Sequence, residues 1–85
     1  MERRKTMSKI IEVKPLKGFK IKAAFEDGVV KVFDALPFLD NASLSRLRDE
    51  EYFKGVEVGS HGDRVTWQEG EEFGADMLYV RGVVI

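Results

Sequence analysis

The stretch from residue 19 to residue 34 reads FKIKAAFEDGVVKVFD. Its first seven residues alternate between apolar and polar side chains, which is typical of a strand with one buried face. The apolar side of this strand carries Phe19, Ile21, Ala23 and Phe25. Asp27-Gly28 follows, and an Asp-Gly pair between apolar runs is typical of a tight turn because both residues tolerate positive φ. Residues 29–34 then return as a second strand, so the stretch predicts an antiparallel hairpin.

Three further strands are predicted on either side of this hairpin. Residues 9–14 are rich in β-branched side chains, and Pro15 is expected to stop this strand because proline cannot donate a ladder bond. Residues 56–58 and 64–67 have strand composition and are joined by a five-residue loop, 59–63.

The segment between the two groups of strands predicts a helix. Residues 42–54 place Leu44, Leu47 and Phe53 in an apolar set and are expected to form the only substantial helix. Residues 74–79 predict a single helical turn. The pattern βββ-α-ββ predicts an α+β domain, with an antiparallel sheet of about five strands and one short helix packed on one face.

The length of 85 residues leaves room for one small domain. We predict a flexible N-terminal segment over 1–8, a single domain over 9–79 and an apolar C-terminal extension over 80–85. The extension is expected to be ordered and partly buried. It would then add to a sheet edge within the chain or pair with a second copy, and we favour a homodimer.

Composition excludes several classes of protein. The chain has no cysteine, which removes disulfides, thiolate metal sites and thiol catalysis. It has no apolar run of about 20 residues and no apolar leader, so a cytoplasmic protein is predicted. Charge is segregated, with a balance of +4 over residues 1–34 and −5 over residues 35–85. This asymmetry indicates a nucleic-acid face, a dipolar protein surface, or lysines that solvate the open side of a sheet.

The residues do not form a catalytic pattern. His61 is the only histidine, and its neighbours Ser60 and Asp63 are too close along one loop to adopt the geometry of a nucleophile, a base and an orienting acid. We therefore predict no catalytic residue, no enzyme activity and no effect of His61→Ala on stability or binding.

A cluster of acids follows the only tryptophan. Its members are Glu69, Glu71, Glu72 and Asp76. Their spacing fits no EF-hand, so the alternative to a hard-cation site is a solvated connector in which Asp76 supports a helix N-terminus. We predict neither a metal nor a cofactor.

Two sets of residues are candidates for binding a partner. The candidate protein-interaction surface comprises Trp67, Phe73, Tyr79, Val83 and Ile85. For Trp67 and Tyr79, packing in the core with their polar atoms hydrogen-bonded is the favoured interpretation, and a recognition surface formed with Phe73 is the alternative. The candidate basic face comprises Lys14, Lys20, Lys22 and Lys31. Because the aromatic residues of the hairpin alternate to the other face, base stacking beside these lysines is not expected, and nucleic acid is the less favoured partner.

An ordered set of short segments runs through residues 8–79. It comprises Phe25-Glu26-Asp27-Gly28, Phe33-Asp34, Leu36-Pro37-Phe38-Leu39, Leu47-x-Asp49, Phe53, Val56-x-Val58 and Trp67-x-x-Gly70-x-Glu72-x-x-x-Asp76-x-Leu78-Tyr79. In this order the set resembles the bacterial DUF2442 family, a domain of unknown function. The resemblance implies a compact α+β domain, found alone or before a helix-turn-helix, with no catalytic residues to carry over. It also implies pairing with another small protein in a regulatory or toxin–antitoxin-like pair.

The chain departs from the family pattern in three places. Glu72 stands where Asp is usual, and Gln68 stands where Pro is common. A helix-turn-helix is not expected after Tyr79. The sequence therefore predicts a non-catalytic protein–protein interaction module with an unidentified protein partner, in a small bacterial regulatory or antitoxin-like pair. The alternative is weak, sequence-independent nucleic-acid binding through the basic face.

Overall fold

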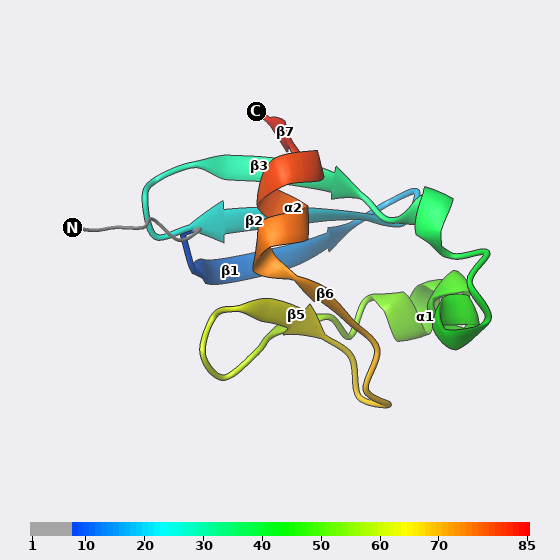
Figure 1. Cartoon of the computed structure of the whole chain (residues 1–85). Helices are drawn as coiled ribbons and strands as arrows, with labels where there is room; N and C mark the ends of the chain where they lie inside the picture. Colours follow the sequence, from blue (N-terminus) through cyan, green and yellow to red (C-terminus); the bar gives the residue numbers. More distant parts are fainter. Residues whose placement is uncertain (1–7) are drawn as a thin grey trace.

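The computed structural model of the chain describes residues 8–85 (Figure 1). The predicted flexible segment 1–8 therefore lies outside the described residues, except for Ser8. The described chain is an α+β domain, as predicted.

The N-terminal part is an antiparallel meander of three strands. These are β1 (Ile10–Leu16), β2 (Lys20–Phe25) and β3 (Val30–Asp34). The Phe25 and Gly28 backbone groups close the predicted hairpin, since the Gly28 N–H donates to the Phe25 carbonyl at 3.0 Å. Gly28 has φ +91, as expected for this turn. Pro15 does not stop β1; it lies inside this strand because β1 is an edge strand, where one side of the backbone makes no ladder bonds.

The single sheet of about five strands is corrected to two sheets. The first has four strands in the order β1-β2-β3-β7, where β7 is Val83–Val84. The second has three strands in the order β4-β5-β6, namely β4 (Glu57–Val58), β5 (Arg64–Thr66) and β6 (Glu72–Gly74). Strand β6 was not predicted, because three residues that include a glycine give no alternation to recognise.

The helices also differ from the prediction. Residues 42–54 are divided into the 3₁₀ helix η2 (Ala42–Arg48) and the one-turn helix α1 (Glu50–Phe53), after a short 3₁₀ turn η1 (Leu36–Phe38). The longest α-helix of the described chain is instead α2 (Ala75–Arg81), where one turn had been predicted. The division occurs at Asp49, whose backbone is extended and whose side chain accepts the Glu51 N–H at 3.0 Å. Asp49 is thus the N-cap of α1 and cannot continue η2.

Helix α2 joins the two sheets. It crosses one face of the four-stranded sheet in Figure 1 and contacts β3, β5 and β6. Near the other end of the second sheet, the Ile10 N–H donates to the Gly62 carbonyl at 2.8 Å. The apolar segment 80–85 is part of this fold, because it completes α2 and supplies β7. The partial burial expected for it is not found within one copy of the chain, since the side chains of Val80, Val83, Val84 and Ile85 are exposed.

A continuous chain of aromatic rings forms much of the core between these elements. The contacts run Phe19–Phe53, Phe53–Trp67, Trp67–Phe73 and Phe73–Phe33, with ring centroids 5.4, 5.6, 5.9 and 5.2 Å apart. Aromatic pairs at this separation stabilise beyond the area they bury. The chain links the β1–β2 turn, α1, both strands β5 and β6, and β3.

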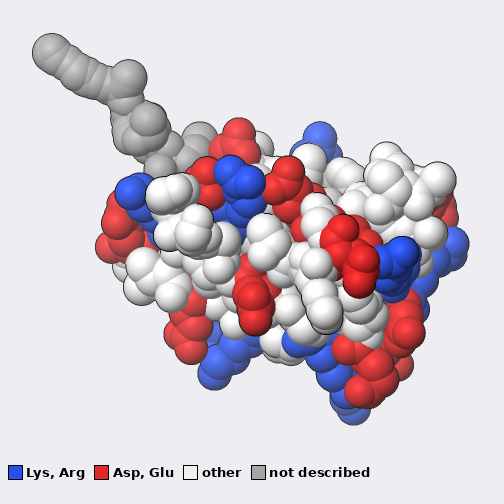
Figure 2. All heavy atoms as spheres, turned by 90° about the horizontal axis from the view of Figure 1, so that it is seen from below, with Lys and Arg blue, Asp and Glu red and all other residues white. Residues whose placement is uncertain are grey.

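The segregation of charge along the sequence does not give one charged side in the view from below. Figure 2 shows Lys and Arg interspersed with Asp and Glu on that face. Several basic residues of the acidic half are paired locally; for example, Arg46 lies 3.3 Å from Glu69 and Arg64 lies 3.2 Å from Glu72. Such exposed pairs contribute little stability, but they cancel charge locally.

The turn at Gly28 gives a direct test of the hairpin. A Cβ at this position would meet no atom within 4 Å, so the cost of a substitution comes from the positive φ alone. We expect Gly28→Val to lower the free energy of unfolding by about 1–2 kcal/mol, because left-handed backbone is strained for a β-branched residue. The measurement is thermal or urea unfolding. Gly28→Asn is the control and should cost less, since asparagine tolerates this region; equal stability of all three proteins would contradict the assigned turn.

Candidate functional site

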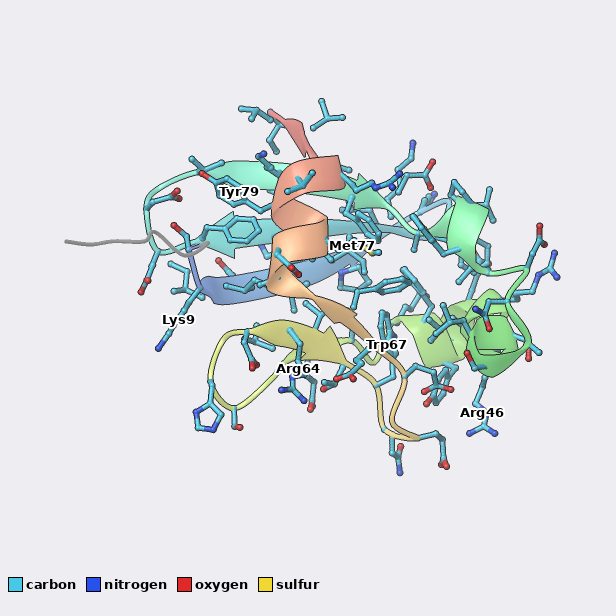
Figure 3. All side chains as sticks on the ribbon, viewed as in Figure 1. Lys9, Arg46, Arg64, Trp67, Met77 and Tyr79 are labelled. Atoms are coloured by element: carbon cyan, nitrogen blue, oxygen red, sulfur yellow. The ribbon has the colours of Figure 1, made fainter. Side chains whose placement is uncertain are left out.

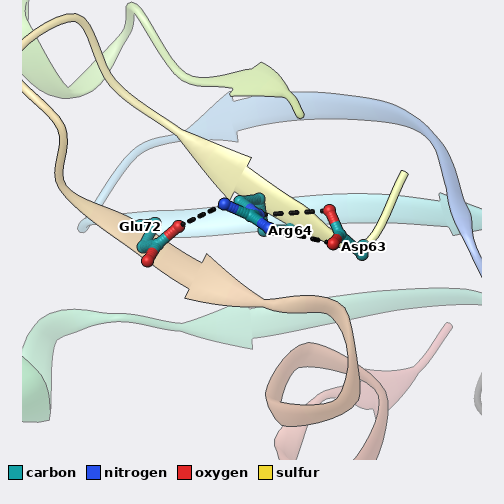
Figure 4. Close-up of polar contacts among 3 residues, drawn as sticks. All are labelled: Asp63, Arg64 and Glu72. Carbon is teal, nitrogen blue, oxygen red and sulfur yellow. Dashed lines mark hydrogen bonds and ion pairs between the residues drawn. The ribbon is translucent and has the colours of Figure 1, made fainter. Parts of the chain in front are cut away.

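The loop that contains His61 does not assemble a catalytic group. His61 is exposed between β4 and β5. The Asp63 carboxylate is bound by the neighbouring Arg64 instead, at 3.1 Å from Nε and 3.0 Å from an Nη (Figure 4). This guanidinium holds the pKa of Asp63 below its usual value. The Arg64 guanidinium also donates to the Glu72 carboxylate on β6, so the contacts among these three residues connect β5 with β6.

The acids of the connector each have a partner other than a metal. Glu69 pairs with Arg46, Glu71 accepts the Tyr52 hydroxyl at 2.6 Å, and Asp76 accepts the Met77 N–H at 2.8 Å in the first turn of α2. Burial and the bond to Glu71 raise the pKa of Tyr52. Within residues 8–85 no three His, Cys, Asp or Glu side chains are grouped so that they could hold a metal ion.

Two aromatic members of the candidate protein-interaction surface, Trp67 and Phe73, lie in the core and are not available to a partner. Trp67 is 4% exposed and Phe73 is 5% exposed. The Trp67 indole N–H donates to the Phe53 carbonyl at 2.8 Å. Figure 3 shows Trp67 between the second sheet and α1, which is the place of a core residue. Tryptophan is usually buried with its N–H bonded, so this position needs no functional explanation.

Tyr79 fixes α2 to the first sheet. Its ring meets that of Phe25 edge-on at 4.9 Å, and its hydroxyl donates to Asp27 at 2.7 Å. Lys31 also contacts Tyr79. Its Nζ lies 4.2 Å from the centroid of the Tyr79 ring and donates a hydrogen bond to the Tyr79 carbonyl. Figure 3 shows Tyr79 extending from α2 over the β2–β3 hairpin. Tyr79 is therefore half-buried and structural.

The contact between Tyr79 and Asp27 predicts a pH effect. The Val29 N–H and the Tyr79 hydroxyl bond the Asp27 carboxylate and lower its pKa from the ordinary 3.8. A carboxylate whose pKa is lower in the folded protein than in the unfolded chain stabilises the fold at pH values above its unfolded-state pKa. This stabilisation is lost as the pH falls through its folded-state pKa. We expect Tyr79→Phe to raise the Asp27 pKa and to weaken the pH dependence of unfolding below about pH 4. Carboxyl carbon titration by NMR measures this pKa.

The control for that prediction is Tyr52→Phe. Tyr52 bonds Glu71, far along the chain from Asp27, so its loss should leave the Asp27 titration unchanged. An Asp27 pKa that is the same in Tyr79→Phe and in the unchanged protein would contradict the assigned bond.

The basic face is corrected from four lysines to three. Residue Phe33 on β3 pairs with the buried Ile21, and Lys31 pairs with the buried Ala23, so Lys31 points to the side that α2 covers. Lys14 pairs with Lys22 on the opposite side of the sheet, and Lys20 shares that side by alternation along β2. We call the side turned away from α2 the open face.

The strand register brings Lys14, Lys22 and the C-terminal Val83 together on the open face. Residues directly opposite one another across neighbouring strands have their side chains on the same face. The central row of the open face is Lys14, Lys22, Val32 and Val83, one residue from each strand. The rows on either side are Glu12, Ala24 and Val30, and Leu16, Lys20 and Asp34. The half formed by β1 and β2 is thus mainly charged, and the half formed by β3 and β7 is mainly apolar.

A shallow hollow lies in the middle of the open face. Its volume is about 180 Å³, and it is lined by Glu12, Lys14, Lys22, Ala24 and Val30. The small side chain of Ala24 between larger neighbours accounts for it. Ala24, Val30 and Val32 were not recognised in the sequence, although they follow from the hairpin: once residues 26–28 form the turn, Ala24 opposes Val30 and Lys22 opposes Val32.

A larger hollow of about 480 Å³ lies between the β1–β2 turn and α1. Its apolar lining consists of Pro15, Leu16 and the Phe19–Phe53 pair, whose rings already pack edge-on. The charged residues around it are Lys17, Glu50 and Lys54. Opposite charges alternate around this rim, so it presents no uniform chemistry to a ligand.

Strand β7 is the outer edge of the four-stranded sheet. Val83, Val84 and Ile85 are 68%, 63% and 67% exposed. Of the residues predicted to form the protein-interaction surface, Val83 and Ile85 are therefore the two that are accessible. None of the helices formed by residues 8–85 has the length and apolar character needed to cross a membrane.

One of three comparisons with known proteins supports the family resemblance found in the sequence. The sequence profile of a family described as "Protein of unknown function (DUF2442)" matches residues 10–83. Neither a curated protein nor a solved structure matches the chain. The family match begins at the first residue of β1 and reaches β7, so it covers both sheets and α2. The chain belongs to the DUF2442 family, whose function is unknown.

Proposed function

We propose that this protein is a non-catalytic protein–protein interaction module that acts in the cytoplasm as one member of a small bacterial regulatory or antitoxin-like pair. The observation that carries the proposal is the apolar edge at β7. Three successive apolar side chains there are each more than 60% exposed, although the strand is paired with β3. Covering exposed apolar surface is favourable by roughly 25 cal/mol per Å². A protein partner that docks on this edge removes it from water.

The backbone of β7 is also available to a partner. The Ile85 N–H donates to the Val30 carbonyl at 3.3 Å, and Val84 lies opposite Lys31. Alternate residues of an antiparallel strand bond the same neighbour, so the N–H and C=O of Val84 point away from β3. An extended segment of a partner can add a strand to the sheet here, with a carbonyl that accepts the Val84 N–H and an N–H that donates to the Val84 carbonyl.

The same edge gives the chain a route to a homodimer. Around a two-fold axis at Val84, the N–H of each copy faces the C=O of the other, so that the edge is self-complementary. A dimer formed in this way has one continuous sheet of eight strands, four from each copy. Sedimentation over a range of concentrations tests it, and Val84→Asp should shift the equilibrium toward monomer.

The matched variants Val84→Asp and Ile11→Asp test the proposed function. Ile11 is 65% exposed on β1, at the other edge of the same sheet, so the two changes place the same charge at equal exposure. The unchanged protein and each variant are expressed with an affinity tag in the host and captured separately. The proteins bound to each are quantified by mass spectrometry. We expect a stoichiometric partner that is lost with Val84→Asp and kept with Ile11→Asp. Equal recovery with both variants, or no stoichiometric partner, contradicts the proposal.

The second candidate is weak, sequence-independent binding of nucleic acid. The observation that favours it is the direct opposition of Lys14 and Lys22, with Lys20 on the same face. Three lysines neutralise about three phosphates, which corresponds to a salt slope near −3 at most. Fluorescence anisotropy with labelled oligonucleotides tests it: submicromolar binding at physiological salt, lost in Lys14→Glu/Lys22→Glu, would make nucleic acid the favoured partner.

A further inference from the structure

We propose that the open face binds an acidic amphipathic helix of the partner protein. The apolar side of this helix covers Val30, Val32 and Val83, and its acidic residues lie over Lys14 and Lys22. This inference rests on the proposed function and names the chemistry of the partner. It follows from the composition of the open face, the size of its two halves, the hollow between them and the arrangement of its charges.

The open face combines two surfaces that the sequence analysis assigned to different functions. Val83 was a candidate for protein contacts, and Lys14 and Lys22 were candidates for a basic face. The register places all three in one row, because Lys14 pairs with Lys22, Lys22 with Val32 and Val32 with Val83. A ligand that covers this row must therefore be apolar at one end and anionic at the other.

The dimensions of the two halves fit a helix. Neighbouring strands are about 4.8 Å apart, so the row from Lys14 to Val83 extends about 14 Å across the sheet. An α-helix with its side chains is about 10–12 Å wide. One helix that lies along β3 thus covers Val30 and Val32 with its apolar stripe, and side chains at the flank of the stripe reach Lys22 and Lys14.

The hollow over Ala24 gives this helix an anchor. Its volume of about 180 Å³ lies below the ~300 Å³ at which small-molecule sites begin, so it takes a single side chain rather than a free ligand. Ala24 and Val30 form its apolar part, and its charged lining consists of Lys14, Lys22 and Glu12, which together carry a net positive charge. An aliphatic side chain of the helix can enter the hollow while an adjacent acid meets a lysine.

The charges of the open face favour an anionic flank. Lys20 lies opposite Asp34, so that pair is compensated, whereas Lys14 lies opposite Lys22, and like charges directly across strands are unfavourable. The remaining charge is Glu12, one row away from Lys14 on β1. A carboxylate placed over Lys14 and Lys22 removes their repulsion, which helps binding specifically to an acidic partner.

The experiment uses the full chain labelled with ¹⁵N and a synthetic helical peptide as the probe. The peptide is about 18 residues long, since shorter helices are marginal in water, with Leu at i, i+3, i+4 and i+7 and Glu on both flanks. We expect saturable changes in the amide shifts of the open-face residues, which are Lys14, Lys22, Ala24, Val30, Val32 and Val83. A second peptide with Lys in place of every Glu should bind about tenfold more weakly or not at all.

Charge reversal of the protein provides the matched control. Lys14→Glu/Lys22→Glu should weaken the acidic peptide about tenfold and strengthen the basic one. Lys17→Glu/Lys54→Glu changes the same number of charges beside the other hollow and should leave both affinities unchanged. Thermal unfolding of each variant shows that it remains folded. Equal binding of the two peptides, or no binding up to millimolar concentration, overturns the assignment of an acidic helix.

The outcomes separate this inference from the proposed function. A host partner that is lost with Val84→Asp but kept with Lys14→Glu/Lys22→Glu supports the interaction module and overturns the helix on the open face. Displacement of the acidic peptide by an oligonucleotide that binds more tightly than the peptide also overturns it, in favour of nucleic acid. Loss of the host partner with both variants, together with binding of the acidic peptide to the open face, supports both proposals.

Discussion

Trp67→Ala should lower the free energy of unfolding by about 3–5 kcal/mol, the range for a buried aromatic residue replaced by alanine. Trp67 is 4% exposed and contacts both Phe53 and Phe73, so its removal opens a cavity at the middle of the aromatic chain. Small domains of this size have a total stability near the lower end of about 5–15 kcal/mol. The variant should therefore keep at most about 2 kcal/mol of stability and begin to unfold at very low urea concentration, as measured by far-ultraviolet circular dichroism during urea titration.

Trp67→Phe separates packing from hydrogen bonding at the same position. Phenylalanine keeps an aromatic ring between Phe53 and Phe73 but cannot donate to the Phe53 carbonyl, which Trp67 binds at 2.8 Å. An unsatisfied buried carbonyl costs about 1–3 kcal/mol, so this variant should lie between the unchanged protein and Trp67→Ala. A loss below about 1 kcal/mol for Trp67→Ala would contradict a core position, since well-packed large-to-small changes cost more than that.

The central hairpin is the part of the fold that local sequence determined best. The alternation in Phe19 to Phe25 fixes which side is buried, and the turn at Asp27-Gly28 fixes which residues oppose one another. The same rule applied one strand further would have placed Lys31 correctly, because Lys31 is two residues from Phe33 and so shares its buried side. Charge alone groups the four lysines together, whereas the alternation along each strand separates Lys31 from the other three.

The second sheet and β7 could not be predicted in the same way. Composition predicts strands over 56–58 and 64–67, where β4 and β5 lie, but β6 and β7 have only three and two residues, too few for a period of two to be recognised. Strands β4 and β6 are defined by pairing with their neighbour β5, whereas β7 pairs with β3 across about 50 residues of sequence. Local composition indicated an apolar segment over 80–85, but only the register with β3 places Val83 beside Val32.

The helices illustrate how caps override apolar periodicity. Leu44, Leu47 and Phe53 suggested one helix, and all three do face the core. Asp49 divides the predicted helix into two. Its side chain accepts N–H groups of the following turn, which favours the start of a new helix over the continuation of the preceding one. Asp49 is a residue type typical of N-caps, so the signal was present in the sequence and was outweighed by the apolar pattern.

The second large effect is expected at Gly82, which connects α2 to β7. A Cβ at this position would lie 2.4 Å from the Leu78 carbonyl oxygen and 2.9 Å from the Lys31 Cβ. Unlike Gly28, Gly82 has an ordinary φ of −72, so its constraint is space rather than backbone conformation. We expect Gly82→Ala to cost about 1–3 kcal/mol, as for other groups forced into a packed site.

The loss should be local to the edge of the first sheet. Gly82 lies where the chain passes from α2 to β7, so moving it displaces β7 while the β1–β2–β3 meander keeps its own pairing. Hydrogen exchange measures this directly: the Ile85 amide, which bonds Val30, should lose protection in Gly82→Ala, whereas the Ile21 amide in β2 should keep it. Arg81→Ala is the control, because it changes the preceding, exposed residue without adding an atom near Leu78.

Gly82→Ala also connects the fold to the proposed interaction. If β7 supplies the edge to which a partner adds, then displacing it should abolish capture of that partner even though Lys14 and Lys22 stay in place. The acidic helical peptide should still contact Lys14, Lys22 and Ala24 but bind more weakly, because Val83 no longer extends the apolar half. An unchanged Ile85 protection in Gly82→Ala would show that the turn into β7 can accommodate a side chain, and the close approach of Gly82 to Leu78 and Lys31 would then be refuted.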